Sequence, residues 1–165
     1  MDRLYSPWRL KYVTAASGEP SAGCIFCAAL ERDDALIVHR GVHTFVILNL
    51  FPYNNGHLMV VPNRHIARLA LANDQELAEL MQLTRAAEVA ITNAYAPHGL
   101  NMGLNLGKPA GAGVLDHLHM HVVPRWDGDT NFMSVVGETR VLPEEIHTTA
   151  ARVRAEFEKL TSAPR

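Results

Sequence analysis

The chain has few cysteines, no long apolar run and no marked excess of charge of either sign. Two cysteines in 165 residues are too few for a disulfide scaffold. Fifteen Lys and Arg against seventeen Asp and Glu leave a formal net charge of −2, so no nucleic-acid partner is expected. The longest apolar stretches, such as residues 58–61, fall far short of the roughly 20 residues that a membrane helix needs, so no membrane partner is expected either.

The composition is that of a folded globular protein. Hydrophobic residues make up 48% and charged residues 19%, which excludes wholesale disorder. The length suits one domain with a sizeable core, over residues 1–165, and is too short for two ordinary domains. The first residues show no secretory signal pattern, and the two cysteines have a spacing typical of metal or redox sites in a reducing compartment. We therefore expect a cytoplasmic protein.

Three segments are predicted along the chain: an N-terminal arm at 1–23, a motif-bearing core at 24–135 and a C-terminal helix at 143–160. A further helix is predicted at 74–96, where apolar residues recur every three to four positions behind an Asn73 cap. The predicted strands are 36–38, 45–48, 57–61, 100–106 and 117–123. Five strands joined mostly by hairpins, with two helices, predict an α+β domain with an antiparallel sheet.

The chain has nine histidines, and three of them fall within residues 117–121. Because side chains alternate along a strand, these three imidazoles are predicted to share one face, with Leu118, Met120 and Val122 on the core side. Neighbouring imidazoles disfavour simultaneous protonation, so at least one is expected to be neutral near pH 7. Three interpretations are open: histidines on a solvated sheet face, a zinc cage, or catalysis with His119 attacking phosphorus.

The pattern of residues 117–123 resembles the signature of the histidine triad (HIT) family of nucleotide hydrolases and transferases. Residues 49–62 resemble the family's nucleoside-binding hairpin, and Asn105-Leu106-Gly107 resembles its Asn-x-Gly strand end. Residues 124–132 resemble the continuation seen in bacterial diadenosine-polyphosphate phosphorylase-like members. The resemblance covers residues 24–135 and implies a HIT-like fold, with about five antiparallel strands and two helices, and a homodimer.

The resemblance also implies roles for the three histidines. His119 would attack the α-phosphorus of a nucleotide and form a covalent nucleotidyl-histidine intermediate. His121 would hydrogen-bond the phosphate oxygens, and His117 would orient the strand or bind metal. His57, at the start of the predicted third strand, is either a support for the triad or an ordinary strand-end residue.

A set of nucleotide-binding residues follows from the same resemblance: Asn49, Asn105, Gly107, Lys108 and Gly113. Asn49 would hydrogen-bond ribose hydroxyls, unless it only caps a turn. Asn105 would contact phosphate, and the backbone N–H groups of the glycine-rich loop 107–113 would hold phosphate oxygens. Lys108 would add charge there, or be a solvated loop lysine.

The chain departs from the best-known hydrolase branches, which carry Gln and Ser or Thr four and three residues before the first triad histidine. Gly113 and Val114 occupy these positions, and Val114 has no group that can hydrogen-bond a leaving phosphate. The resemblance therefore favours phosphorolysis of diadenosine tetraphosphate to ADP and ATP, with inorganic phosphate as acceptor. The alternatives are a hydrolase that releases AMP with water as acceptor, and a nucleotide-binding module without turnover.

Cys24 and Cys27 form half of a structural zinc site. His65 and His117 resemble the histidine ligands of zinc-containing family members, which implies a structural Zn²⁺ site made of Cys24, Cys27, His65 and His117. The alternatives are two reduced cysteines without metal, a redox dithiol, which lacks a surrounding thioredoxin pattern, and zinc catalysis by the triad itself.

Overall fold

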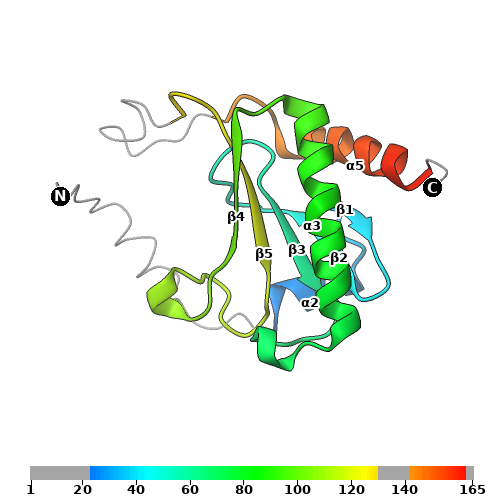
Figure 1. The fold of residues 1–165 in the computed structure, drawn as a ribbon, viewed down its shortest axis with the longest axis vertical. Coiled ribbons are helices and arrows are strands. Elements are labelled where there is room, and N and C mark those ends of the chain that lie inside the picture. The colour runs from blue at the N-terminus through cyan, green and yellow to red at the C-terminus, as the bar shows by residue number, and fades with distance from the viewer. Residues whose placement is uncertain (1–22, 130–141, 163–165) are drawn as a thin grey trace.

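A computed structural model describes residues 23–129 and 142–162 (Figure 1). Its five-stranded antiparallel sheet has the order β1-β2-β3-β5-β4. The strands are β1 (Ile37–Arg40), β2 (Thr44–Leu48), β3 (Leu58–Pro62), β4 (Gly99–Leu104) and β5 (Met120–Arg125). The helices are α2 (Ile25–Glu31), α3 (Asp74–Tyr95) and α5 (Ile146–Ser162), with the short 3-10 helices η1 (Leu69–Leu71) and η2 (Lys108–Ala110). The predicted α+β class and antiparallel sheet are confirmed.

Helices α3 and α5 pack on one face of the sheet (Figure 1). The Thr44 hydroxyl donates to Glu79 of α3 over 3.0 Å, which shows which way the β2 side chains face. Thr44 pairs with Pro62, and β3 pairs with β5 through Met59 and His121. Because side chains alternate along a strand, His121 therefore points to the face opposite α3. The triad therefore lies on the face opposite α3, and buried core residues such as Phe45 and Val61 lie on that face as well.

Three expectations about the elements need correction. The described residues form three α-helices rather than two, because α2 follows Cys24 directly and its seven residues are too few to show a helical period. The C-terminal helix begins at Ile146 rather than 143, where the Glu145 carboxylate accepts from the N–H groups of His147 and Thr148. The fifth strand begins at Met120, so two triad histidines precede the paired strand.

Parts of other expectations lie outside the described residues. These parts are positions 1–22 of the predicted arm and 130–135 at the end of the predicted core. In the part of the chain that is described, no helix is both long and apolar enough to cross a membrane.

The start of α3 confirms the predicted cap. Asn73 Oδ1 accepts from the Glu76 N–H at 2.9 Å, and Glu76 Oε2 accepts from the Asn73 N–H at 2.9 Å. Arg64 adds two hydrogen bonds to the same carboxylate, at 2.9 and 2.8 Å, although Glu76 is almost fully buried. The Arg64 guanidinium lowers the pKa of Glu76 to about 2. This carboxylate therefore ties the β3–α3 connection to the helix as an anion.

Replacing Glu76 by glutamine is expected to lower the free energy of unfolding by about 2 kcal/mol at pH 7. The depressed pKa of Glu76 makes its contribution fully present above about 4.5 and progressively lost as the pH falls toward 2. Urea titrations at pH 7 and pH 3.5 measure the difference, with exposed Glu88→Gln on the same helix as control. If Glu76→Gln lowered the free energy of unfolding by the same amount at both pH values, Glu76 would not stabilise the fold as a buried anion.

Candidate functional site

The three histidines at 117, 119 and 121 are not solvated on a sheet face. His117 and His119 are 1% and 5% exposed, and His121 is half-buried. The His119 and His121 ring centroids lie 4.8 Å apart with the rings nearly perpendicular. Leu118 is buried as expected, whereas Met120 is only half-buried. Burial of three imidazoles requires partners for their ring nitrogens, and these partners define what each histidine can do.

His119 is held in one tautomer by the backbone. Its Nδ1 lies 2.8 Å from the carbonyl oxygen of His117, and a carbonyl can only accept, so Nδ1 carries the proton. The lone pair is therefore on Nε2. Burial lowers the pKa of His119, which keeps the ring neutral at neutral pH. A neutral imidazole with a free Nε2 lone pair can act as a nucleophile.

His121 receives the opposite tautomer through a chain of hydrogen bonds. The Tyr53 N–H donates to His57 Nδ1 over 3.1 Å, so the proton of His57 is on Nε2. That nitrogen lies 2.9 Å from His121 Nδ1 and donates to it, which leaves the His121 proton on Nε2. Burial, and then the nearby His119, lower the pKa of His121 to about 4. His121 thus offers a donor beside the nucleophile.

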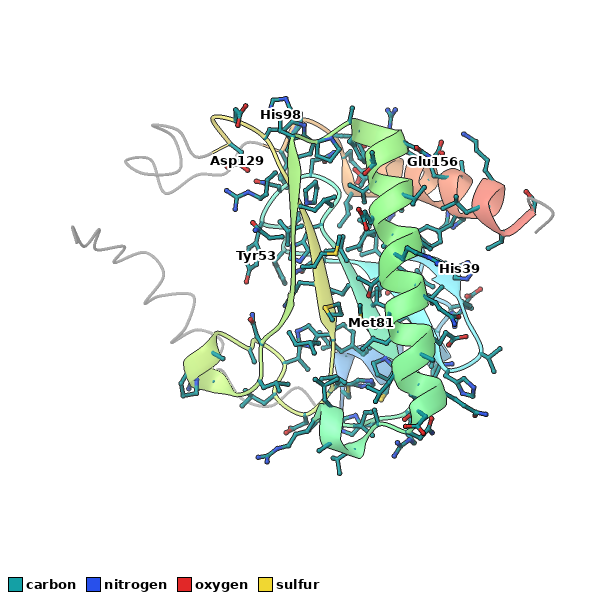
Figure 2. The ribbon with its side chains drawn as sticks, viewed as in Figure 1. His39, Tyr53, Met81, His98, Asp129 and Glu156 are labelled. Atoms are coloured by element: carbon teal, nitrogen blue, oxygen red, sulfur yellow. The ribbon has the colours of Figure 1, made fainter. Side chains whose placement is uncertain are left out.

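His57 supports the triad directly, one of the two roles open from the sequence. It is completely buried, and the Tyr53 ring stacks on it with centroids 4.9 Å apart. In the view of Figure 2, Tyr53 and α3 lie on opposite sides of β4. The buried His57 imidazole donates to His121 Nδ1 and so keeps the His121 proton on Nε2.

The second cluster contains Cys24, Cys27, His65 and His117, whose donor atoms all lie within 4.8 Å of one another. His117 Nδ1 lies 3.2 and 3.7 Å from the sulfurs of Cys24 and Cys27, and His65 Nδ1 lies 3.5 Å from Cys27 Sγ. Zn–S and Zn–N bonds in a tetrahedral site put neighbouring sulfur and nitrogen ligands about 3.5 Å apart. These three sulfur–nitrogen distances are therefore compatible with a metal site formed by the cluster.

Two further observations fit this donor set to a metal. His117 Nε2 lies 2.8 Å from the Pro62 carbonyl oxygen and donates to it, which turns the bare Nδ1 toward the cysteines. Burial raises the pKa of the Cys27 thiol, so a nearby cation is needed to make it a thiolate at neutral pH. Among the described residues, the cluster includes His117 but neither His119 nor His121, which does not favour a zinc cage made by the triad.

Asn49 makes the turn contact that was one of its two expected roles. Its Oδ1 accepts from the Phe51 N–H at 2.9 Å, and its Nδ2 lies 3.4 Å from His57 Nδ1. The side chain thus braces the turn that leads to His57. An amide oxygen has two lone pairs, so the turn contact leaves one of them for a further donor.

The chain leaves β4 beside the triad. Leu104 pairs with Met120, so Asn105 departs from the sheet next to His119, and Gly103 pairs with His121. A Cβ at Gly103 would meet no atom within 4 Å, which shows open space on this strand. The strand register therefore brings Asn105 close to the triad segment.

The loop after Asn105 turns tightly and is exposed. Gly107 has a φ of +86°, a conformation that favours glycine, and Gly113 lies exposed further along. Lys108 is exposed at the start of η2. Val114 is half-buried and packs against the hydrophobic core. Because valine has no hydrogen-bonding group, this position offers no side-chain donor.

A cavity of about 670 Å³ lies elsewhere. It lies where the C-terminal end of α3 meets the start of α5, and its lining includes Tyr95, Glu144 and Arg152 but no triad histidine. These three side chains satisfy one another, because the Tyr95 hydroxyl and the Arg152 guanidinium both donate to Glu144.

Comparison with known proteins places this geometry in context. A family model described as the HIT domain matches residues 31–128. AP-4-A phosphorylase from Mycobacterium tuberculosis is 41% identical over 165 residues, which cover 95% of this chain and 85% of that protein. A zinc-bound histidine triad family protein from Mycobacterium smegmatis has a TM-score of 0.69 at 28% identity, covering 86% of this chain and 98% of the other.

A histidine triad nucleotide-binding protein from Sulfolobus tokodaii, described as hypothetical, has a TM-score of 0.70 at 28% identity, covering 84% of this chain and 94% of the other. The family match spans more than half of the chain and includes the triad with its supporting His57. The chain belongs to the histidine triad family.

Proposed function

We propose that this protein is a nucleotidyltransferase that cleaves diadenosine tetraphosphate, with inorganic phosphate as acceptor and ADP and ATP as products. The observation that carries the proposal is the hydrogen bond from His119 Nδ1–H to the His117 carbonyl, which leaves the Nε2 lone pair of a neutral imidazole for attack. The mycobacterial AP-4-A phosphorylase at 41% identity supports the substrate.

The reaction proceeds in two displacements at one phosphorus. His119 Nε2 attacks the α-phosphorus, an N–P bond forms, and the bond to the polyphosphate oxygen breaks to release ATP. The ring gains positive charge while its Nδ1–H stays on the His117 carbonyl. An oxygen of inorganic phosphate then attacks the same phosphorus, which breaks the N–P bond, yields ADP and restores neutral His119.

His121 serves both displacements as a hydrogen-bond donor. Its Nε2–H, directed by His57, lies on the side of the nucleophile, and charge develops on the phosphoryl oxygens in each transition state. A neutral donor suits this role because its proton is available across the whole neutral range.

The remaining contacts to the nucleotide come from segments that lie near the triad. Asn49 offers an amide oxygen lone pair to the ribose hydroxyls. Asn105, Gly107 and Gly113 carry side-chain and backbone donors to the phosphates, and exposed Lys108 adds positive charge. Val114 cannot hydrogen-bond a leaving group, which favours the phosphorylase branch over the hydrolase branch.

Cys24, Cys27, His65 and His117 would hold a structural Zn²⁺. When bound, this ion supplies a cross-link between α2, the segment after β3 and the triad segment, and no part of the phosphoryl chemistry. The cysteines must stay reduced to serve as ligands, which supports a cytoplasmic location.

A homodimer completes the proposal. Strand β4 forms one edge of the sheet and carries exposed side chains along most of its length, including Met102. Edge strands present unpaired backbone groups that a second copy can cover.

Incubation of the zinc-loaded protein with diadenosine tetraphosphate tests the reaction. We expect ADP and ATP in equal amounts, only when inorganic phosphate is present, because phosphate is the second nucleophile. With ³²P-labelled phosphate, the label is expected in ADP and not in ATP, since ATP is the leaving group of the first step. Chromatography separates the products.

The other outcomes identify the alternatives. AMP and ATP formed without phosphate would mean that water is the acceptor and that the protein is a hydrolase. No product, with nucleotide still bound, would mean a binding module without turnover.

A further inference from the structure

Phe26 lies between the two cysteines of the metal cluster and contacts the nucleophile. It is 2% exposed, and its ring centroid lies 5.2 Å from that of His119 and 5.4 Å from that of His117. It is the second residue of α2, so the helix cap Cys24 precedes it by two positions and Cys27 follows it directly. One side of the helix thus faces the metal cluster, and Phe26 reaches the catalytic imidazole.

The geometry points to Phe26 as a positioning residue, which, together with the carbonyl of the metal ligand His117, keeps the Nε2 of His119 facing the substrate. This inference rests on the proposed role of His119 as nucleophile. It assigns to the metal cluster a second task besides stability, which is to fix the direction in which the nucleophile points.

Two contacts of the His119 imidazole carry the inference. The His117 carbonyl takes the Nδ1–H at 2.8 Å, and the Phe26 ring packs on the imidazole at an interplanar angle of 46°. The hydrogen bond alone fixes only the position of Nδ1 and leaves the ring free to rotate about that contact. The phenyl group fills the space into which the imidazole would otherwise rotate, and such rotation would carry Nε2 away from the substrate.

Both contacts originate in the metal cluster. The His117 ring is held by the Pro62 carbonyl on one side and faces the two sulfurs on the other, so its backbone carbonyl is fixed as well. Helix α2 is only seven residues long, so its position depends on the core contacts of Phe26 and Ala29 as well as on the two cysteines of the metal cluster. When the cluster is loosened, the carbonyl and the phenyl ring are both released.

The test compares two buried phenylalanines that each pack on a histidine. Phe26 packs on His119, whereas Phe157 stacks on His39 with centroids 5.2 Å apart, away from the triad. Both are fully buried, so Phe26→Leu and Phe157→Leu remove similar packing. Only Phe26→Leu is expected to lower kcat, by between about 10- and 100-fold, while KM stays within about two-fold of wild type.

A spectroscopic readout separates positioning from stability. In ¹⁵N-labelled zinc-loaded protein, long-range ¹H–¹⁵N spectra report which nitrogen of His119 carries the proton. We expect a single Nδ1–H form in wild type and in Phe157→Leu, and a mixture of both tautomers in Phe26→Leu, with zinc content unchanged in all three. Wild type stripped of zinc, at a temperature where it stays folded, is expected to show the same mixture.

Three results would overturn the inference: one Nδ1–H form in Phe26→Leu, the same single form after zinc removal, or equal kcat losses in Phe26→Leu and Phe157→Leu. Failure of the proposed function has a different signature. It would appear as absence of nucleotidyl transfer by wild type, whereas the tautomer spectra need no turnover and still decide where the His119 proton lies.

Discussion

Replacing His119 by alanine is expected to lower kcat for diadenosine tetraphosphate cleavage by roughly 10⁴- to 10⁶-fold, the scale seen when a covalent nucleophile is removed. The structure gives the reason, because His119 alone among the triad has its Nε2 lone pair free and Nδ1 fixed on the backbone. His117 uses its ring for the metal cluster, and His121 presents a proton rather than a lone pair. No neighbour replaces the missing nucleophile.

Acid-free quenching of the reaction with α-³²P-labelled substrate is the decisive measurement. A labelled nucleotidyl adduct should remain on wild-type protein, should be lost on mild acid treatment, as phosphoramidates are, and should be absent from His119→Ala. Nucleotide affinity should change little, since the ribose and phosphate contacts remain. Exposed His98→Ala is the matched control, because among the described residues its imidazole pairs only with Asp127 and contacts no triad histidine. Full activity or a persistent adduct in His119→Ala would refute the mechanism.

Much of the fold follows from local sequence patterns. Short apolar runs between turn signals predicted the first three strands within a few residues, and alternating apolar residues predicted the last two. The Asn73-x-x-Glu76 cap predicted the start of α3 because both partners lie within one helical turn. The alternation at 117–123 predicted which side chains share the triad, although pairing with the sheet begins only at Met120. Short-range periodicity carries this information directly.

The supports of the site depend on contacts between distant segments. His117 meets Cys24 across 93 positions, and His57 meets His121 across 64, so no local pattern reveals which nitrogen carries which proton. The metal set was predicted only through the family resemblance. The contact of Phe26 with His119 had no signal at all, because a phenylalanine between two cysteines is as consistent with ordinary core packing.

Removing His65, a proposed metal ligand, is expected to be the second large effect. His65 is exposed, so its replacement by alanine removes no buried apolar surface, and without a metal it would cost almost nothing. If the side chain holds Zn²⁺ with Cys24, Cys27 and His117, the loss of the site is expected to cost about 4 kcal/mol. For a chain of this length that corresponds to a fall in Tm of about 10 °C.

Calorimetry with and without a chelator measures this effect. Wild type treated with chelator should melt like His65→Ala, and added Zn²⁺ should raise the Tm of wild type but not of the variant. Exposed His147→Ala on α5 is the control and should melt like wild type in both conditions. If His65→Ala had the same Tm as wild type both with and without zinc, the proposed metal site would be wrong.

The time course of activity under chelation separates a structural ion from a catalytic one. A structural ion is lost as α2 and the triad segment loosen, so activity should decline slowly and in step with loss of zinc from the folded protein. A catalytic ion would instead be needed at every turnover, and activity would stop at once. The cluster leaves His119 and His121 outside its donor set, and on that geometry the slow decline is the expected result.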